Sequence, residues 1–497
     1  MKVHSNTLRR LRVAIAAIFF MAITLLFLDF TGSVHAYLGW MARLQFLPAI
    51  LSANILVIAA ILILTLVIGR IYCSVICPLG IFQDGISHIS GLRKKKKLRF
   101  QYKSAHNIAR YLILLFFIAA VVVGLGSVFS LLAPYSAYGR IVQNLFSPIY
   151  LSINNFLAYI SERSDSYTFY SKDVWIKSLP TFIIALLTFI IITFLSWKNG
   201  RAYCNTICPV GTFLSFFAGK AWFKIHIDQD KCVNCGVCTK KCKASCIDIK
   251  NHKIDYTRCV VCADCIDNCA KKAISFSHIR KSKSSATTDT SRRAFLIGST
   301  LLVGSIAKAQ QKKKIDGGLA IIEKKKVPVR YTPISAPGSL SLKNMYSHCT
   351  SCGLCISVCP NDVLRPSSSL NHLMQPTLSY ERGFCRPECT KCSEVCPSGA
   401  IKPIGRDVKS STQIGHAVWI KDNCLPVRDD IHCGSCARHC PSGAIKMVKL
   451  NPDESSSPRV PAVNTEICIG CGACEYLCPA RPFSAIYVEG NEVHRII

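Results

Sequence analysis

Cysteine spacing is the feature of this 497-residue chain that most restricts what it can fold into. Twenty-four of its 29 cysteines form six runs of four, and all six runs end in C-x-x-C-x-x-x-C. Bacterial ferredoxin loops use this spacing to bind a [4Fe–4S] cube. Zinc knuckles and disulfides are the alternatives, but zinc ribbons lack a third cysteine at i+6 and a fourth at i+10 before a proline. The spacing therefore favours six [4Fe–4S] clusters and an electron-transfer function.

The six runs fall into a first block of two and a second block of four. In a two-cluster ferredoxin, three neighbouring thiolates bind one cube and the fourth cysteine of the run reaches the other cube. Proline follows the last cysteine of every run in the second block, whereas Lys243 and Ala270 take that place in the first. The predicted ligands are Cys232, Cys235, Cys238, Cys242, Cys259, Cys262, Cys265 and Cys269 in the first block, and Cys349, Cys352, Cys355, Cys359, Cys385, Cys389, Cys392, Cys396, Cys424, Cys433, Cys436, Cys440, Cys468, Cys471, Cys474 and Cys478 in the second.

Three cysteines depart from this pattern. Cys385 lies one residue too far from Cys389, and Cys424 lies nine residues before Cys433. Ligation by Cys424 is therefore the assignment that departs furthest from the ferredoxin spacing. Cys246 falls outside every run, and we expect a small buried thiol there rather than a ligand.

Apolar residues are concentrated in the first 200 positions. Hydrophobic residues make up 50% of the chain, and they gather at about 11–29, 47–69, 108–133 and 178–197. Each stretch is long enough for a membrane helix of about 20 residues. The stretches 47–69 and 178–197 contain no ionisable residue before their flanks, which disfavours buried helices of a soluble domain. The sequence predicts an α-helical membrane bundle with four spans, followed by α+β ferredoxin domains.

Positive charge gathers beside these stretches. The formal net charge is +32, and basic residues precede the first stretch, form the run 93–99 and follow residue 197. The positive-inside rule places the N-terminus, the 70–107 loop and the segment after 197 in the cytoplasm. No nucleic-acid-binding motif accompanies the charge, so we expect no nucleic-acid partner.

The segment 134–177 is then expected on the outer side. Its part 141–160 is fairly apolar but contains glutamine, asparagine and proline. These residues favour an interfacial or re-entrant segment that could line a quinone pocket over a further span. A lid packed on the helices explains the composition equally well.

A motif occurs twice in the membrane region. The sequence GRIYCSVICPLGIF at 69–82 is repeated as GRAYCNTICPVGTF at 200–213. Each copy follows a pair of apolar stretches, which predicts two tandem helix–helix–motif repeats with both motifs on the cytoplasmic face. Cysteines at i and i+4 share one side of a helical turn, so two such pairs could bind one additional metal ion or cluster. A redox dithiol pair and packing cysteines are the alternatives. The thiols concerned are Cys73, Cys77, Cys204 and Cys208.

A second targeting signal is predicted inside the chain. After the polar linker 279–291, the sequence SRRAFLIGSTLLVGSIAKAQ resembles a twin-arginine export signal, with possible cleavage after Ala309. An ordinary short helix after a basic linker is the alternative. The expected domains are a membrane domain at 1–220, a cytoplasmic two-cluster ferredoxin domain at 221–280, a linker and signal or anchor at 281–310, and a four-cluster periplasmic domain at 311–497.

These motifs resemble two families joined end to end. Residues 1–280 resemble NapH, the membrane ferredoxin of periplasmic nitrate reductase systems, and residues 291–497 resemble NapG, its exported four-cluster partner. The resemblance implies a multi-pass protein of the bacterial inner membrane that acts as a quinol dehydrogenase module. Electrons would leave menaquinol or ubiquinol and reach a periplasmic terminal reductase or its cytochrome.

The sequence contains no binding motif for haem, a nucleotide or a covalent flavin. No transmembrane histidine pair or C-x-x-C-H is present for haem, and no glycine loop is present for a nucleotide. The Ser-Gly-Ala sequences at Ser398 and Ser442 continue with isoleucine, so no covalent flavin is expected. The remaining alternative is a membrane iron–sulfur accessory factor for the assembly of a respiratory oxidase or reductase.

Overall fold

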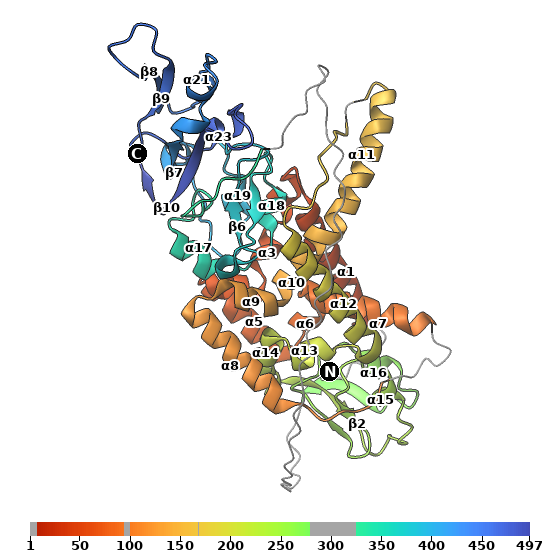
Figure 1. The fold of residues 1–497 in the computed structure, drawn as a ribbon. Helices are drawn as coiled ribbons and strands as arrows, with labels where there is room; N and C mark the ends of the chain where they lie inside the picture. The colour runs from red at the N-terminus through yellow and green to blue at the C-terminus, as the bar shows by residue number, and fades with distance from the viewer. Residues whose placement is uncertain (1–6, 94–99, 167, 279–324) are drawn as a thin grey trace, which may run out of the picture.

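Three parts of the chain are stacked along one long axis (Figure 1). The computed structural model describes residues 7–93, 100–166, 168–278 and 325–497. A helical layer, residues 7–222, lies in the middle. The ferredoxin domain, residues 223–278, lies at one end, and the C-terminal domain, residues 325–497, lies at the other. The predicted export signal and cleavage position fall outside the described residues, as does most of the basic run 93–99.

The helical layer is built from α-helices and one π-helical turn, η1. Its elements are α1 (Thr7–Leu28), α2 (Ser33–Leu38), α3 (Trp40–Arg43), α4 (Phe46–Leu51), α5 (Ile55–Ile68), α6 (Tyr72–Val75), α7 (Pro78–Arg93), α8 (Asn107–Val123), α9 (Gly126–Leu132), α10 (Pro134–Ile141), η1 (Val142–Phe146), α11 (Ser147–Arg163), α12 (Leu179–Asn199), α13 (Ala202–Thr206) and α14 (Pro209–Ala218).

Two of the four apolar stretches form helices long and apolar enough to cross a membrane, namely α1 and α12. The stretch 47–69 is divided into α4 and α5 because Ala53 adopts a positive φ of 52° and the Asn54 side chain caps α5 by accepting from Val57 N. The stretch 108–133 is divided at Gly124, whose φ of 79° ends α8. Four uninterrupted spans are therefore not observed.

The polar segment after α8 turns back into the layer. Every residue of α10 is buried, and α10 continues through η1 into α11. The Arg140 guanidinium donates to the carbonyl oxygens of Ser130 (2.8 Å) and Leu131 (3.4 Å) at the end of α9. This contact satisfies backbone acceptors that would otherwise be unpaired inside an apolar layer. The segment 141–160, for which a re-entrant segment or a lid is expected, forms η1 and most of α11.

The ferredoxin domain consists of short elements around two small antiparallel sheets. Strand β1 pairs with β4, from Phe223↔His278 to Ile227↔Ile274, and β2 pairs with β3. The elements are β1 (Phe223–Ile227), α15 (Val237–Lys241), β2 (Ile247–Asp248), β3 (Lys253–Ile254), α16 (Asp264–Asp267) and β4 (Ile274–His278).

The C-terminal domain contains three two-stranded antiparallel sheets, β5–β6, β8–β9 and β7–β10. The long pair β7–β10 joins the middle of the domain to the end of the chain. The elements are α17 (Leu342–His348), α18 (Leu354–Ser357), β5 (Leu364–Pro366), η2 (Leu370–His372), β6 (Pro376–Leu378), α19 (Lys391–Val395), α20 (Arg406–Ser411), β7 (Thr412–Trp419), η3 (Lys421–Asn423), α21 (Leu425–Arg428), α22 (Ser435–Arg438), β8 (Ile445–Lys449), β9 (Arg459–Val463), α23 (Ala473–Leu477) and β10 (Ile486–Ile496).

The C-terminal domain packs directly on the helical layer, and one continuous core of buried residues runs through both. Gly139 of α10 lies against the loop before α18, so closely that a Cβ there would stand 2.4 Å from the carbonyl oxygen of Cys352. Lys391 Nζ donates to Thr31 O at 2.8 Å across the same interface. These contacts fix the position of the predicted cluster ligands relative to the helices.

Candidate iron–sulfur sites

In the ferredoxin domain, the fourth cysteine of the first run crosses over to lie among the thiols of the second run. Cys242, from the first run, lies within electrostatic range of Cys262 and Cys265 of the second run, and these thiols surround a small internal space. The first three thiols of the first run lie close to one another. From the ligand exchange of two-cluster ferredoxins, we expect Cys269 to complete that set. We name the sets site I, with Cys232, Cys235, Cys238 and Cys269, and site II, with Cys242, Cys259, Cys262 and Cys265.

Cys246 lies against site II. Its side chain is 1% exposed, and its sulfur lies 3.5 Å from the sulfur of Cys242. This hydrogen bond lowers the pKa of Cys242, against the opposing effect of burial. Because a ligating thiolate has no proton to donate, the Cys246 thiol is the donor. The extra cysteine is therefore a neighbour of the predicted ligands.

The C-terminal domain repeats this crossing twice. Cys396 lies among the first three thiols of the preceding run, and Cys359 lies among the first three of the following run. Cys440 and Cys478 exchange in the same way between the last two runs. The sets are site III, Cys349, Cys352, Cys355 and Cys396; site IV, Cys385, Cys389, Cys392 and Cys359; site V, Cys468, Cys471, Cys474 and Cys440; and site VI, Cys424, Cys433, Cys436 and Cys478.

Local structure accommodates the two longer intervals between predicted ligands. The extra residue between Cys385 and Cys389 lies in a turn, and both thiols still face site IV. Cys424 is the N-cap residue of the short helix α21, and its thiol lies close enough to those of Cys433 and Cys478 to interact electrostatically with them. The chain between Cys424 and Cys433 therefore forms a longer loop around the same set of thiols.

The chemistry of the sets fits a multi-iron cluster. Burial raises the pKa of thiols such as Cys352, to about 11, and Cys471, to about 12, so that a bound cation is needed to favour their thiolate forms. Within residues 7–93, 100–166, 168–278 and 325–497, no three histidine, cysteine or acidic side chains converge tightly enough to hold a single ion. Sets of four cysteine thiols are the ligands that [4Fe–4S] clusters use.

The four sites of the C-terminal domain follow one another away from the helical layer. Site III lies against α10, and its Cys355 is within electrostatic range of Cys392 in site IV. Cys385 of site IV is near Cys471 of site V, and Cys474 of site V is near Cys436 of site VI. The sequence could not give this order because the contacts join runs that are distant along the chain.

The four cysteines of the repeated motif also converge. Each is 4% exposed, and each lies within electrostatic range of others from both copies of the motif. We name this set the joint site; it consists of Cys73, Cys77, Cys204 and Cys208. The structure therefore brings together, from two halves of the chain, the thiols that the repeat predicts to be equivalent.

Two buried arginines bind the two copies of the motif to each other. Arg70 Nη2 donates to the carbonyl oxygen of Cys204 at 3.0 Å, and Arg201 Nη1 donates to that of Cys73 at 2.6 Å. Each guanidinium also lies 3.9 Å from the sulfur of the cysteine three residues after it. The exchange is reciprocal, as expected for two related halves. Two guanidinium groups beside four thiols place positive charge where an anionic thiolate-bound cluster would need it.

An ion-pair network joins this region to site II. Asp84 of α7 accepts from Arg201 at 2.7 Å, and Lys243 Nζ lies 3.0 Å from Asp84 and 3.1 Å from Asp264. Burial alone would raise the pKa of Asp84, but Arg201 and Lys243 outweigh it and hold this pKa below its ordinary range. Lys243 occupies the position that proline takes in the other domain, so the departure in sequence has a structural role in docking the ferredoxin domain.

Two tyrosines lie between the joint site and site III. Tyr72 is within electrostatic range of Cys73 and Cys77, and Tyr135 is within range of both Tyr72 and Cys352. At the other end, Arg70 Nη1 donates to Thr257 O at 2.9 Å, two residues before the first ligand from the second run of site II. The cysteine sets thus form one series from site II of the ferredoxin domain, through the joint site, to site VI.

Sequence reasoning missed the side chains that support these sets. The signal for Arg70 and Arg201 was present, because Gly-Arg and Tyr-Cys recur at the same positions in both copies of the motif. No local pattern identifies Asp84, because its partners come from three separate segments.

The fold and these sites define a multi-cluster ferredoxin. A family profile described as a 4Fe-4S binding domain matches residues 51–98 and 179–228. Two further profiles are described as 4Fe-4S dicluster domains; one matches residues 255–363, and the other matches residues 348–400 and 431–481. The chain belongs to the ferredoxin-type 4Fe-4S electron-transfer proteins related to NapG, NapF and MauM.

Three relatives illustrate the extent of the similarity. The methylamine utilization ferredoxin-type protein MauM of Methylobacillus flagellatus is 31% identical over 167 residues, covering 32% of this chain and 70% of MauM. The ferredoxin-type protein NapG of Escherichia coli is 29% identical over 152 residues, covering 29% of this chain and 64% of NapG. An uncharacterized protein of Methanocaldococcus jannaschii is 28% identical over 279 residues, covering 56% of this chain and 98% of that protein.

Proposed function

We propose that this chain is an electron-transfer protein of the bacterial cytoplasmic membrane. It oxidises menaquinol or ubiquinol and passes the electrons through [4Fe–4S] clusters to an exported terminal reductase or its cytochrome. The observation that carries the proposal is the series of cysteine sets at both ends of one apolar helical layer. Clusters bound there would supply one-electron acceptors, while the chain fixes their order and surroundings.

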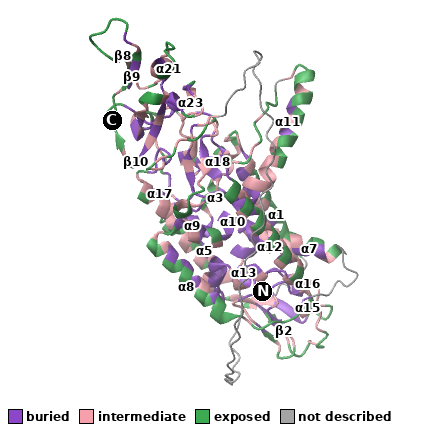
Figure 2. Cartoon of the chain, viewed as in Figure 1, coloured by how far each residue is buried: buried purple, intermediate pink, exposed green. Residues whose placement is uncertain are grey.

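The outer surface of the helical layer supports a membrane location. Ile18 on α1, Leu56 on α5, Val122 on α8, Phe156 on α11 and Phe194 on α12 are each more than half exposed. Figure 2 shows broad exposed surfaces along α8 and α11. An apolar surface spread over five helices costs free energy in water and is the type of surface that lipid covers. Helices α1 and α12 provide the two longest crossings.

The distribution of charged segments supports an orientation. Arg9, at the start of α1, pairs with Asp264 (3.1 Å) and Asp267 (2.8 Å) of the ferredoxin domain, so the basic N-terminus and that domain share one end of the layer. At the other end, Lys177 pairs with Asp362 of the C-terminal domain at 3.4 Å. The positive-inside rule assigns the first end to the cytoplasm. The twin-arginine-like sequence between the two domains agrees with export of the second.

The joint site deepens this proposal. Both segments matched by the 4Fe-4S binding domain profile contain one of its thiol pairs. We therefore assign to the four thiols a cluster shared between the two halves of the repeat. Such a cluster would fill the interval between site II and site III, with Arg70 and Arg201 balancing its negative charge.

Iron content tests the joint site. Six cubes need about 24 irons per chain, and a seventh raises this to about 28. Cys73→Ser and Cys204→Ser should each remove the same iron and the same paramagnetic signal, whereas Cys246→Ser should remove none. If both variants keep the wild-type iron content, the repeated motif is structural and no shared cluster exists.

Quinol oxidation is tested on anaerobically purified full-length protein in detergent. Menadiol and a short-chain ubiquinol should each be tried as reductants, with dithionite as the control. The expected result is partial bleaching of the visible cluster absorption by quinol, because a cluster takes one electron and its potential decides whether it is reduced. Bleaching by dithionite alone would contradict the proposal and favour an accessory role in assembly.

A further inference from the structure

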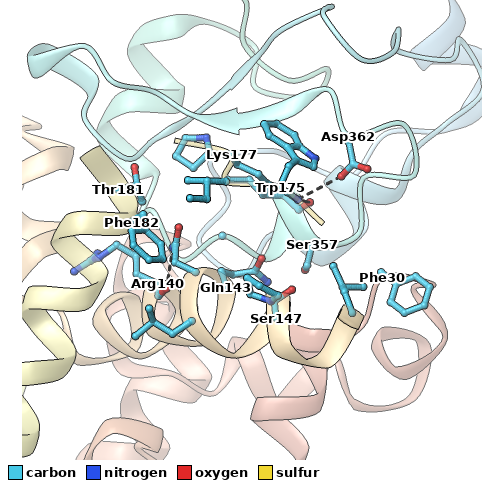
Figure 3. Close-up of a pocket in the computed structure, with 18 of the residues that line it drawn as sticks. Phe30, Arg140, Gln143, Ser147, Trp175, Lys177, Thr181, Phe182, Ser357 and Asp362 are labelled. Atoms are coloured by element: carbon cyan, nitrogen blue, oxygen red, sulfur yellow. Dashed lines mark hydrogen bonds and ion pairs between the residues drawn. The ribbon is translucent and has the colours of Figure 1, made fainter. Parts of the chain in front are cut away.

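An internal cavity lies where the helical layer meets the C-terminal domain (Figure 3). Its volume is about 400 Å³, within the range of small-molecule sites. One wall consists of η1, the start of α11 and the first turn of α12. The opposite wall is the loop and helix at 351–359, which carries predicted cluster ligands. The cavity thus separates an apolar helical region from the sites that would accept electrons.

The helical wall combines apolar surface with a few polar groups. Leu145 and Phe182 supply apolar surface, and Gln143 and Asn144 bring amide groups to the same wall. Arg140 also lines the cavity, and its Nε has no hydrogen-bond partner among the described residues. These groups lie on or beside the π-helical turn, an irregularity that occurs often at functional sites. A ligand with an apolar body and hydrogen-bonding oxygens matches this wall.

The opposite wall brings the ligands of two different sites to one cavity. Cys352 belongs to site III and Cys359 to site IV, and both line it. A molecule held there would border two neighbouring one-electron acceptors. This geometry suits a donor that releases two electrons.

The mouth of the cavity is polar. Lys177 Nζ lies 3.4 Å from Asp362 Oδ1 and donates to Ile356 O at 3.3 Å. Asp362 remains 25% exposed, and its carboxylate can accept a hydrogen bond from a ligand hydroxyl while in contact with solvent. Trp175 closes the adjoining side, where it lies beneath the guanidinium groups of Arg365 and Arg382.

We propose that this cavity is the quinol-oxidising site, an inference that rests on the function proposed above. The quinol ring lies between η1 and the 351–359 loop, and its isoprenoid tail extends past Phe182 along α12. Each quinol loses two O–H protons to solvent at the mouth and becomes quinone. Its two electrons would pass, one each, to the [4Fe–4S] clusters that the cysteines of sites III and IV would hold. Site I and site II take no part in this step.

The experiment fills the cavity and compares a matched variant. Ser147 lines the cavity at the first residue of α11, whereas Ser152 on the same helix is exposed and outside it. Ser147→Trp should therefore displace the quinone, and Ser152→Trp should not. Full-length variants are compared for iron content, for reduction by dithionite, for reduction by menadiol, and for labelling by a photoreactive azidoquinone followed by peptide mass spectrometry.

The expected result is labelling of wild-type peptides from 143–151 or 351–357. Ser147→Trp should lose this labelling and slow menadiol-driven reduction by about tenfold or more, with iron content and dithionite reduction unchanged. Asn144→Leu, a second variant that alters the polar wall with little change in volume, should weaken labelling in the same direction.

Three outcomes would overturn the inference. Normal menadiol reduction in both tryptophan variants would mean that quinol is oxidised elsewhere, while the proposed function stands. Labelling that any acyl-chain lipid displaces as well as quinone would identify a lipid site. Wild-type protein that only dithionite reduces would refute the proposed function itself.

Discussion

The hydrogen bond from Cys246 to the predicted ligand Cys242 gives a measurable redox prediction. A donor to a ligating sulfur stabilises the reduced, more negative cluster, so its loss should lower the reduction potential. A net hydrogen bond contributes about 0.5–1.5 kcal/mol, and a thiol is a weak donor, so we take about 0.5–1 kcal/mol. For a one-electron couple, in which about 59 mV corresponds to a tenfold change, this equals about 20–40 mV. Cys246→Ala should therefore lower the potential of site II by this amount.

The assay is a potentiometric titration of the full-length protein followed by electron paramagnetic resonance. Cys246 is 1% exposed, so bulk water has little access to replace the lost donor. Cys246→Ser keeps a hydroxyl donor and should shift the potential by less than half as much. Site I serves as an internal control, because the Cys246 thiol interacts with Cys242 and Cys259 of site II. A potential that stays constant or rises in the alanine variant would refute the reasoning.

Three further predictions concern packing, docking and topology. Gly80→Ala should destabilise the protein by about 1–3 kcal/mol, because its Cβ would lie 2.2 Å from Cys73 O. Gly85 has open space around it, so Gly85→Ala should stabilise α7 by about 0.5–1 kcal/mol. Thermal unfolding measures both effects. Lys243→Met should lower the free energy of unfolding by about 1–3 kcal/mol, less than the loss of an isolated buried ion pair, because Asp84 keeps its two arginine partners. The variant should raise hydrogen exchange throughout 223–278, and unchanged exchange would contradict the docking role. A reporter active only in the periplasm should work when fused after residue 497 and fail after residue 280; equal activity at both positions would rule out the orientation.

The cysteine spacing predicted 4Fe-4S ferredoxin domains, which the family profiles confirm, because a ferredoxin loop depends on close sequence neighbours. The crossing of Cys242 into the other set of the first block follows from that rule. The repeat likewise indicated that Cys73 and Cys204 are equivalent, and the structure brings them together. In each case the informative residues lie within one short motif or within two copies of it.

Features that depend on backbone breaks or on distant segments could not be predicted. Hydropathy treats 47–69 as one stretch, but the turn at Ala53 and the cap at Asn54 divide it. The cavity between η1 and the 351–359 loop joins segments about 200 residues apart, and only tertiary packing brings them together. The role of Lys243 was visible in sequence only as a missing proline.

The end-to-end series of cysteine sets has a consequence for the membrane potential. In the proposed orientation, an electron entering at site I and leaving at site VI carries its charge outward across the whole apolar layer without a proton. Moving one elementary charge through 100 mV changes its energy by about 2.3 kcal/mol, and a negative interior favours outward electron movement. Electrons from a quinol in the proposed site beside site III would bypass this crossing. The same chain could therefore deliver electrons by one route that dissipates the membrane voltage and by another that is nearly insensitive to it.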